Sequence, residues 1–141
     1  MKRKTVLVCL LLGFLVMLCA CQKKGETERS YENAQDVSFE IVSGSDVPYK
    51  VNEKIFKVKE EGFGFSYRDG DVMYTAFGFG QQNTGGYSIQ VLAVKETESA
   101  IIIEAQLIAP EAEEVIVNQP STPYMILKMA NAEKDVQFLL H

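Results

Sequence analysis

Side chains able to catalyse a reaction or hold a metal ion are scarce in this chain of 141 residues. The single histidine is His141, the last residue, where little packing would fix an imidazole as a general base. All three cysteines, Cys9, Cys19 and Cys21, lie near the N-terminus. Catalysis by a serine or cysteine beside a histidine, and zinc binding by His and Cys, are therefore not expected. We predict a protein that is not an enzyme, with no metal and no cofactor.

The carboxylates and glycines do not change this interpretation. Asp69 and Asp71 flank Gly70, but the further ligands of a calcium loop do not follow, so a solvated hairpin turn is expected. The acidic cluster at residues 111–114 is interpreted as a solvated loop, with contact to a basic partner surface as the alternative. The glycines of residues 78–86 match no phosphate-binding motif and lead into a strand instead of a helix.

The N-terminus has the pattern of an export signal. Residues 2–4 are basic and residues 5–17 are apolar, which is shorter than the roughly 20 residues of a membrane-spanning helix. Residues 18–21, LCAC, resemble a bacterial lipobox, in which small residues precede a cysteine that becomes acylated. The resemblance implies a signal peptide at residues 1–20 and a lipid on Cys21. An ordinary signal peptide or a retained anchor are the alternatives.

Charge and location follow from this processing. The full chain has 14 Lys and Arg against 19 Asp and Glu; loss of residues 1–20 leaves 11 against 19, a net charge of −8. The basic stripe that nucleic acid requires is absent. Two or more acyl chains hold a protein stably on a bilayer. We expect an extracytoplasmic, membrane-anchored bacterial lipoprotein.

The rest of the chain predicts a short tether and one folded domain. Residues 21–36 are mostly polar and are expected to be a flexible tether, and residues 37–141 to form a single β-rich domain. Residues 37–42 alternate between apolar and polar, which predicts a half-buried strand. Apolar side chains at i, i+4 and i+7 predict an amphipathic helix over residues 47–61, capped by Ser45 or Asp46. A strand at residues 55–59 is the alternative.

The pattern from residue 63 onward is that of short strands separated by turns. We predict a mainly β fold: an Ig-like or sandwich-type antiparallel β domain of six to seven strands, with one N-terminal amphipathic helix. A partly open barrel is the alternative. Beyond residues 37–42, the expected strands cover residues 63–67, 72–79, 87–95, 100–108, 122–129 and 136–140, with a further short strand possible at residues 115–117.

Two loops of this domain are candidates for binding a partner. In the first, glycines stand beside an aromatic residue between two strands; in the second, proline stiffens the chain beside another aromatic residue. Each has a plain alternative, a strained turn or strand entry followed by a tyrosine in the core. The candidate residues are Asn83, Thr84, Gly85, Gly86 and Tyr87 in the first loop and Thr122, Pro123 and Tyr124 in the second.

The order and spacing of these loops resemble the PrcB C-terminal domain family. Residues from about 74 to 129 show a strand ending in Gly80, the Thr-Gly-Gly-Tyr of residues 84–87 and the Thr-Pro-Tyr of residues 122–124 before an apolar strand. The resemblance implies a lipoprotein without catalytic residues that binds protein partners and assembles or stabilises a cell-surface protease complex. The partner would be an extracellular protease or another surface protein.

Two other functions stay open. The same two loops are similar in order and character to those of chagasin-type inhibitors of cysteine proteases, which are Ig-like sandwiches, although the tryptophan and arginine of those loops are missing here. The third possibility is an envelope lipoprotein that holds a small ligand, for which a deep apolar cavity would be needed.

Overall fold

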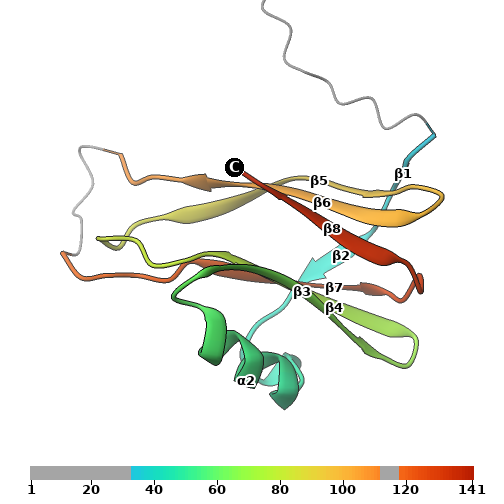
Figure 1. Cartoon of the computed structure of the whole chain (residues 1–141), viewed down its shortest axis with the longest axis horizontal. Coiled ribbons are helices and arrows are strands. Elements are labelled where there is room, and N and C mark those ends of the chain that lie inside the picture. The colour runs from blue at the N-terminus through green and yellow to red at the C-terminus, as the bar shows by residue number, and fades with distance from the viewer. Residues whose placement is uncertain (1–32, 112–117) are drawn as a thin grey trace, which may run out of the picture. The chain divides into compact units, whose positions relative to one another are not determined.

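The computed structural model describes residues 33–111 and 118–141. The chain divides into two units, Met1–Ser30 and Tyr31–His141, and all described residues belong to the second. They form eight strands, one α-helix and one short 3-10 helix (Figure 1). The bounds are β1 Gln35–Asp36, β2 Phe39–Ile41, η1 Gly44–Asp46, α2 Tyr49–Val58, β3 Gly62–Asp69, β4 Val72–Phe79, β5 Ser88–Glu96, β6 Ala100–Ile108, β7 Tyr124–Ala130 and β8 Asp135–Leu140.

The strands make two four-stranded sheets, with orders β1-β5-β6-β8 and β2-β7-β4-β3. The predicted mainly β domain with one helix is therefore confirmed. Two details differ from expectation: the described strands number eight, and β8 runs parallel to β6 while the other neighbouring pairs are antiparallel. The chain reaches β8 from β7 in the opposite sheet, so no hairpin forces β8 to run antiparallel to β6.

The first predicted strand is divided between the sheets, which accounts for the extra strand. β1 pairs with β5, and the Val37 amide still donates to the Val94 carbonyl at 3.0 Å. The chain then crosses, and β2 pairs with β7 in the other sheet. All three residues of β2 are exposed, so the predicted half-burial of residues 37–42 is wrong for this strand.

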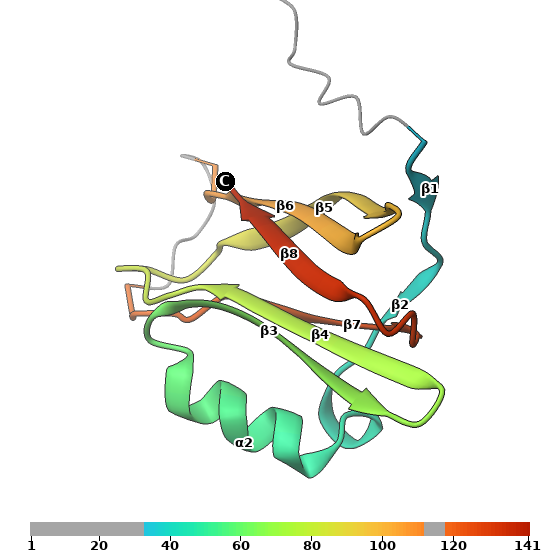
Figure 2. The same ribbon diagram turned by 45° about the vertical axis from the view of Figure 1, so that its right-hand side comes forward.

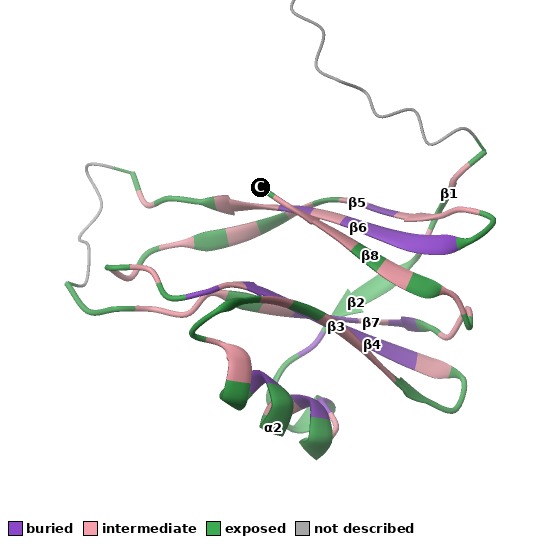
Figure 3. Ribbon diagram, viewed as in Figure 1, coloured by how far each residue is buried: buried purple, intermediate pink, exposed green. Residues whose placement is uncertain are grey.

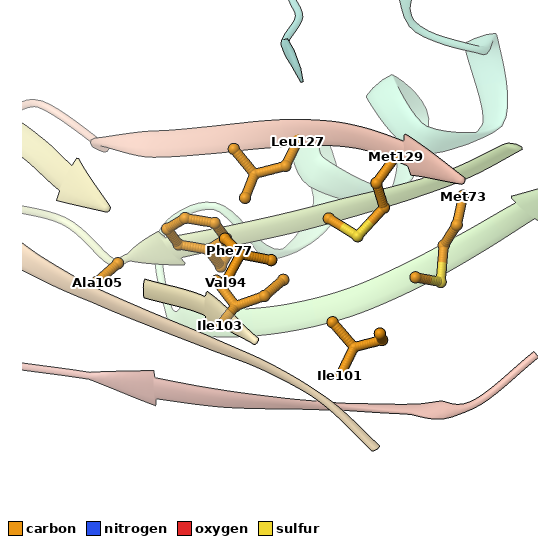
Figure 4. Close-up of a cluster of buried hydrophobic side chains, with 8 residues drawn as sticks. All are labelled: Met73, Phe77, Val94, Ile101, Ile103, Ala105, Leu127 and Met129. Atoms are coloured by element: carbon orange, nitrogen blue, oxygen red, sulfur yellow. The ribbon is translucent and has the colours of Figure 1, made fainter. Parts of the chain in front are cut away.

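The main core lies between the two sheets. Side chains of β4 and β7 meet those of β5 and β6, and many of them are fully excluded from water (Figure 4). Phe138 of β8 packs tilted against Phe77 of β4, with ring centroids 6.1 Å apart. The cluster consists of Met73, Phe77, Val94, Ile101, Ile103, Ala105, Leu127 and Met129.

A second apolar layer joins α2 to the outer face of the sheet β2-β7-β4-β3 (Figure 2). Val51 and Ile55 of the helix are buried there against Tyr74, Ala76 and Ile126. β4 is thus covered on both faces, which explains why its sequence is apolar without alternation.

The helix is shorter than predicted, and its start differs. α2 covers Tyr49–Val58 instead of residues 47–61, and Pro48 is its N-cap. Ser45 and Asp46 lie in η1 and do not cap α2. The strand alternative for residues 55–59 is wrong, because Ile55–Val58 are helical. The predicted turn between β3 and β4 is present, with Gly70 at φ +61°. The strand considered at residues 115–117 lies outside the described residues.

Candidate functional site

The two candidate loops lie side by side at one end of the sandwich. Gln82 and Ser121 form an isolated antiparallel bridge between them. The Gln82 amide donates to the Ser121 carbonyl at 2.8 Å, and the Ser121 amide donates back to the Gln82 carbonyl at 3.1 Å. Figure 1 shows both loops at the left, where β4 and β6 end and β5 and β7 begin. The fold therefore brings together segments almost forty residues apart in the chain.

Backbone atoms carry most of the remaining links between the loops. The Ser121 hydroxyl donates to the Thr84 carbonyl at 2.7 Å. The Phe79 amide donates to the Pro123 carbonyl at 3.1 Å, next to the point where β7 begins. Main-chain groups and the small Ser121 side chain make these bonds. The tyrosine, asparagine and threonine side chains of the candidate loops take no part in them.

A third segment, which the sequence did not indicate, supports the first loop. Gly86 has φ +87°, and a Cβ there would lie 2.9 Å from Cβ of Pro110. Both the torsion angle and the close approach require glycine. The strained turn considered for the first loop is therefore present at Gly86. The sequence alone does not indicate this role of Pro110, because its contact with Gly86 depends on how the sheets fold.

The base of the first loop is tied to the junction between α2 and β3. Gly80 has φ +75°, and a Cβ there would lie 3.1 Å from the Gly62 nitrogen. The Gln81 amide donates to the Glu60 carbonyl at 3.1 Å. Gln82 in turn donates through its side chain to the Phe79 carbonyl at 3.2 Å. We call residues 80–87, 110 and 119–124 together the loop cluster.

The two tyrosines of the loop cluster differ in exposure. Tyr124 is 45% exposed, so the alternative that places it in the core is wrong. It stands opposite Gly78 in the register of β7 and β4, and a Cβ on Gly78 would lie 3.1 Å from Cβ of Tyr124. Tyr87 is half-buried. Of the other candidate residues, Asn83 and Gly86 are exposed, and Thr84, Gly85, Thr122 and Pro123 are half-buried.

Among the described residues, one pair of titratable side chains lies toward this end of the sandwich. The His141 imidazole Nε2 lies 2.9 Å from Oε1 of Glu104, and both side chains are partly exposed. The backbone of His141 extends the pairing of β8 with β6: its amide donates to the Ala105 carbonyl at 3.0 Å and its carbonyl accepts from Leu107 at 2.9 Å. Within residues 33–111 and 118–141, no group of three or more His, Cys, Asp or Glu is placed to hold a metal ion.

A polar hollow lies at the other end of the sandwich, and a lysine side chain of the domain itself occupies part of it. It is lined by residues of the β5–β6 turn, of β1 and of the β7–β8 turn. Lys134 fills part of it, with its Nζ 2.7 Å from Glu96 Oε1 and 2.8 Å from the Thr97 carbonyl. The ammonium group is thus already paired, and the hollow lies far along the strands from the loop cluster.

One segment of the chain matches a known protein family. Residues 73–130 match the PrcB C-terminal family. The match begins in β4 and ends with β7, so it includes the four central strands and the whole loop cluster, and leaves out β1, β2, α2, β3 and β8. The family predicted from residues 74–129 is confirmed, and the chain is PrcB-like over this segment. No curated protein and no solved structure matched the chain.

Proposed function

We propose that this protein is a lipid-anchored extracytoplasmic accessory protein that binds a protein partner through the loop cluster. The partner would be a cell-surface protease or a protein assembled with one, and the role would be assembly or stabilisation, without catalysis by this chain. The observation that carries the proposal is the Gln82–Ser121 bridge, which joins the two candidate loops beside the exposed Tyr124 within the segment that matches the PrcB C-terminal family.

The construction of the loop cluster suits recognition. Hydrogen bonds between main-chain groups, the Gly86 contact with Pro110 and the link to Glu60 restrain the loops before any partner arrives. A restrained loop loses little conformational entropy on binding, and a tyrosine adds a large contact area with few rotatable bonds. Asn83 and Tyr124 supply an exposed amide and an exposed aromatic ring at the same end of the domain.

The proposed anchor is the lipid on Cys21, which lies outside the described residues. None of the helices in the described ranges is long and apolar enough to cross a membrane. Mass spectrometry of the intact protein extracted from membranes tests the anchor. We expect a chain that begins at Cys21 and carries the mass of acyl groups, and a full-length unmodified chain would contradict it.

Co-purification from detergent-solubilised membranes tests partner binding. We expect the Tyr124→Ser variant to lose the partner recovered with the parent protein, identified by mass spectrometry. Leu92→Ser is the matched control: Leu92 is also 45% exposed, but it lies within β5, away from the loop cluster.

The results also separate the proposed function from its alternatives. Equal partner recovery with Tyr124→Ser and the parent protein would contradict binding through the loop cluster. Slowing of a papain-like enzyme by the added protein would instead indicate a protease inhibitor, and an accessory protein is expected to leave that enzyme's rate unchanged.

A further inference from the structure

The outer side of α2 exposes two large aromatic side chains. Tyr49 is 78% exposed and Phe56 is 74% exposed, the two highest values among the large hydrophobic residues of the described part. They are seven residues apart, close to two turns, so they project from the same side of the helix about 10 Å apart. Val51 and Ile55 hold the opposite side against the sheet. Figure 3 shows the exposed side of α2 facing away from the sheets.

The same helix gathers the positive charge of an acidic domain. Residues 49–59 contain four lysines and one glutamate, a net charge of +3. The rest of the described residues contain four Lys and Arg against 13 Asp and Glu, a net charge of −9. Charge is thus separated, with α2 as the positive element, although Glu60 and Glu61 follow it directly. The four lysines are Lys50, Lys54, Lys57 and Lys59.

One lysine of α2 lies beside an exposed ring of the helix, and another reaches back to a half-buried ring of β3. Nζ of Lys59 lies 5.1 Å from the centroid of the Phe56 ring, and Nζ of Lys54 lies 4.2 Å from that of Phe65. Lys57 Nζ lies 2.7 Å from Glu53 Oε1, and this hydrogen bond raises the pKa of Lys57 above its usual value. Exposed aromatic rings beside lysine side chains are typical of helices that lie in the plane of a membrane interface.

We propose that the outer side of α2 docks on the surface of a bilayer containing anionic phospholipid, with Tyr49 and Phe56 entering the headgroup region. The proposal rests on the proposed anchor at Cys21. Anionic headgroups attract the lysines and repel the acidic remainder, which turns α2 toward the bilayer. The loop cluster lies at the strand ends and not on the outer side of α2, so this orientation leaves it open to a neighbouring surface protein.

The tether is long enough for this orientation. Thirteen residues separate Cys21 from β1, which begins at Gln35. A flexible segment of that length spans about 20 Å as a root-mean-square distance. Two stacked sheets are about 10 Å apart, and a helix has a diameter of about 10 Å. A tether of this length is therefore sufficient to reach from a bilayer past a domain of that thickness, and linkage to the lipid would raise the local concentration of α2 at the membrane.

The absence of tryptophan from the chain allows a site-specific test. The Phe56→Trp variant of the full acylated chain is reconstituted in vesicles of phosphatidylglycerol with phosphatidylcholine, and in vesicles of phosphatidylcholine alone. We expect the tryptophan emission to shift to the blue and to be quenched by brominated lipid only with phosphatidylglycerol. The Leu92→Trp variant is the control and is expected to show neither change.

Lysine variants test the role of charge. Adding Lys50→Gln to Phe56→Trp is expected to lower the ratio of docked to undocked protein about fivefold, the effect of one lysine near an anionic surface. Lys95→Gln, on β5 of the opposite sheet, is the matched control and is expected to leave the ratio unchanged.

The readouts separate this proposal from the proposed function. Flotation of the protein with the vesicles reports on the anchor, and partner recovery reports on the loop cluster. Flotation without a blue shift would overturn docking of α2 while leaving the anchor in place. An equal shift on both kinds of vesicle would overturn the part played by anionic lipid, and a shift that needs an added protein instead of lipid would assign α2 to a protein interface.

Discussion

Thr75 places a hydroxyl group inside the apolar core. The residue is fully buried in β4, and its Oγ1 has no hydrogen-bond partner among the described residues. An unpartnered buried hydroxyl costs free energy, while valine fills nearly the same volume without a polar atom. We expect Thr75→Val to raise the free energy of unfolding by about 1 kcal/mol. Urea denaturation checks this, and a loss of stability would mean that the hydroxyl makes a stabilising contact.

Gly78 is required by contact and not by its torsion angle. A Cβ there would lie 2.5 Å from Cε1 of Phe63 and 3.1 Å from Cβ of Tyr124. We expect Gly78→Ala to lower the free energy of unfolding by about 1–3 kcal/mol through overpacking. Gly62→Ala is the control, because its nearest contact would be an ordinary 3.9 Å, and its effect should stay within about 0.5 kcal/mol. Equal stability of the two variants in urea would contradict the packing described for Gly78.

Among the single elements, α2 attaches to the sheet through one buried side. Ile55 is buried in the second apolar layer, whereas its neighbour Phe56 is exposed. Truncation to alanine should lower the free energy of unfolding by about 2–4 kcal/mol at Ile55 and change it by less than about 0.5 kcal/mol at Phe56. Urea denaturation of both variants compares them, and a large loss with Phe56→Ala would show that this ring packs inside the free protein.

Most elements could be predicted because their signals are local. The strands from β3 to β8 follow alternation, apolar runs and turn residues, and their predicted bounds mostly differ from the observed ones by one or two residues. The sequence patterns did not predict structure that depends on pairing with a strand far away in the chain. β1 and β2 separate because they pair with β5 and β7 in different sheets. The parallel pairing of β8 with β6 likewise depends on the crossing from one sheet to the other.

The candidate site could be predicted in part for the same reason. The glycines and prolines of the two loops are visible in the sequence, and the family resemblance placed both loops in one site. The supports of the loop cluster were missed, because the contacts of Pro110 with Gly86 and of Glu60 with Gln81 join segments that only the fold brings together. Exposure of Tyr124 also depends on its place at the start of β7, which the motif does not specify.

At the scale of the whole domain, the two proposed surfaces belong to different parts of the sandwich. The loop cluster is built where the central strands end, within the segment that matches the PrcB C-terminal family. The aromatic and basic side of α2 lies on the outer layer and outside that segment. We infer that the two surfaces have separate roles: the outer side of α2 orients the domain on the bilayer, and the loop cluster holds a partner protein.

Site-specific photo-crosslinking in intact membranes tests binding through the loop cluster most directly. A benzophenone side chain is introduced in place of Asn83, Tyr124 or the control residue Leu92. We predict that the Asn83 and Tyr124 positions give an adduct with the same protein and that Leu92, equally exposed with Tyr124, gives none. Adducts from Leu92 alone, or different proteins captured from Asn83 and Tyr124, would contradict a single contact surface formed by the two loops.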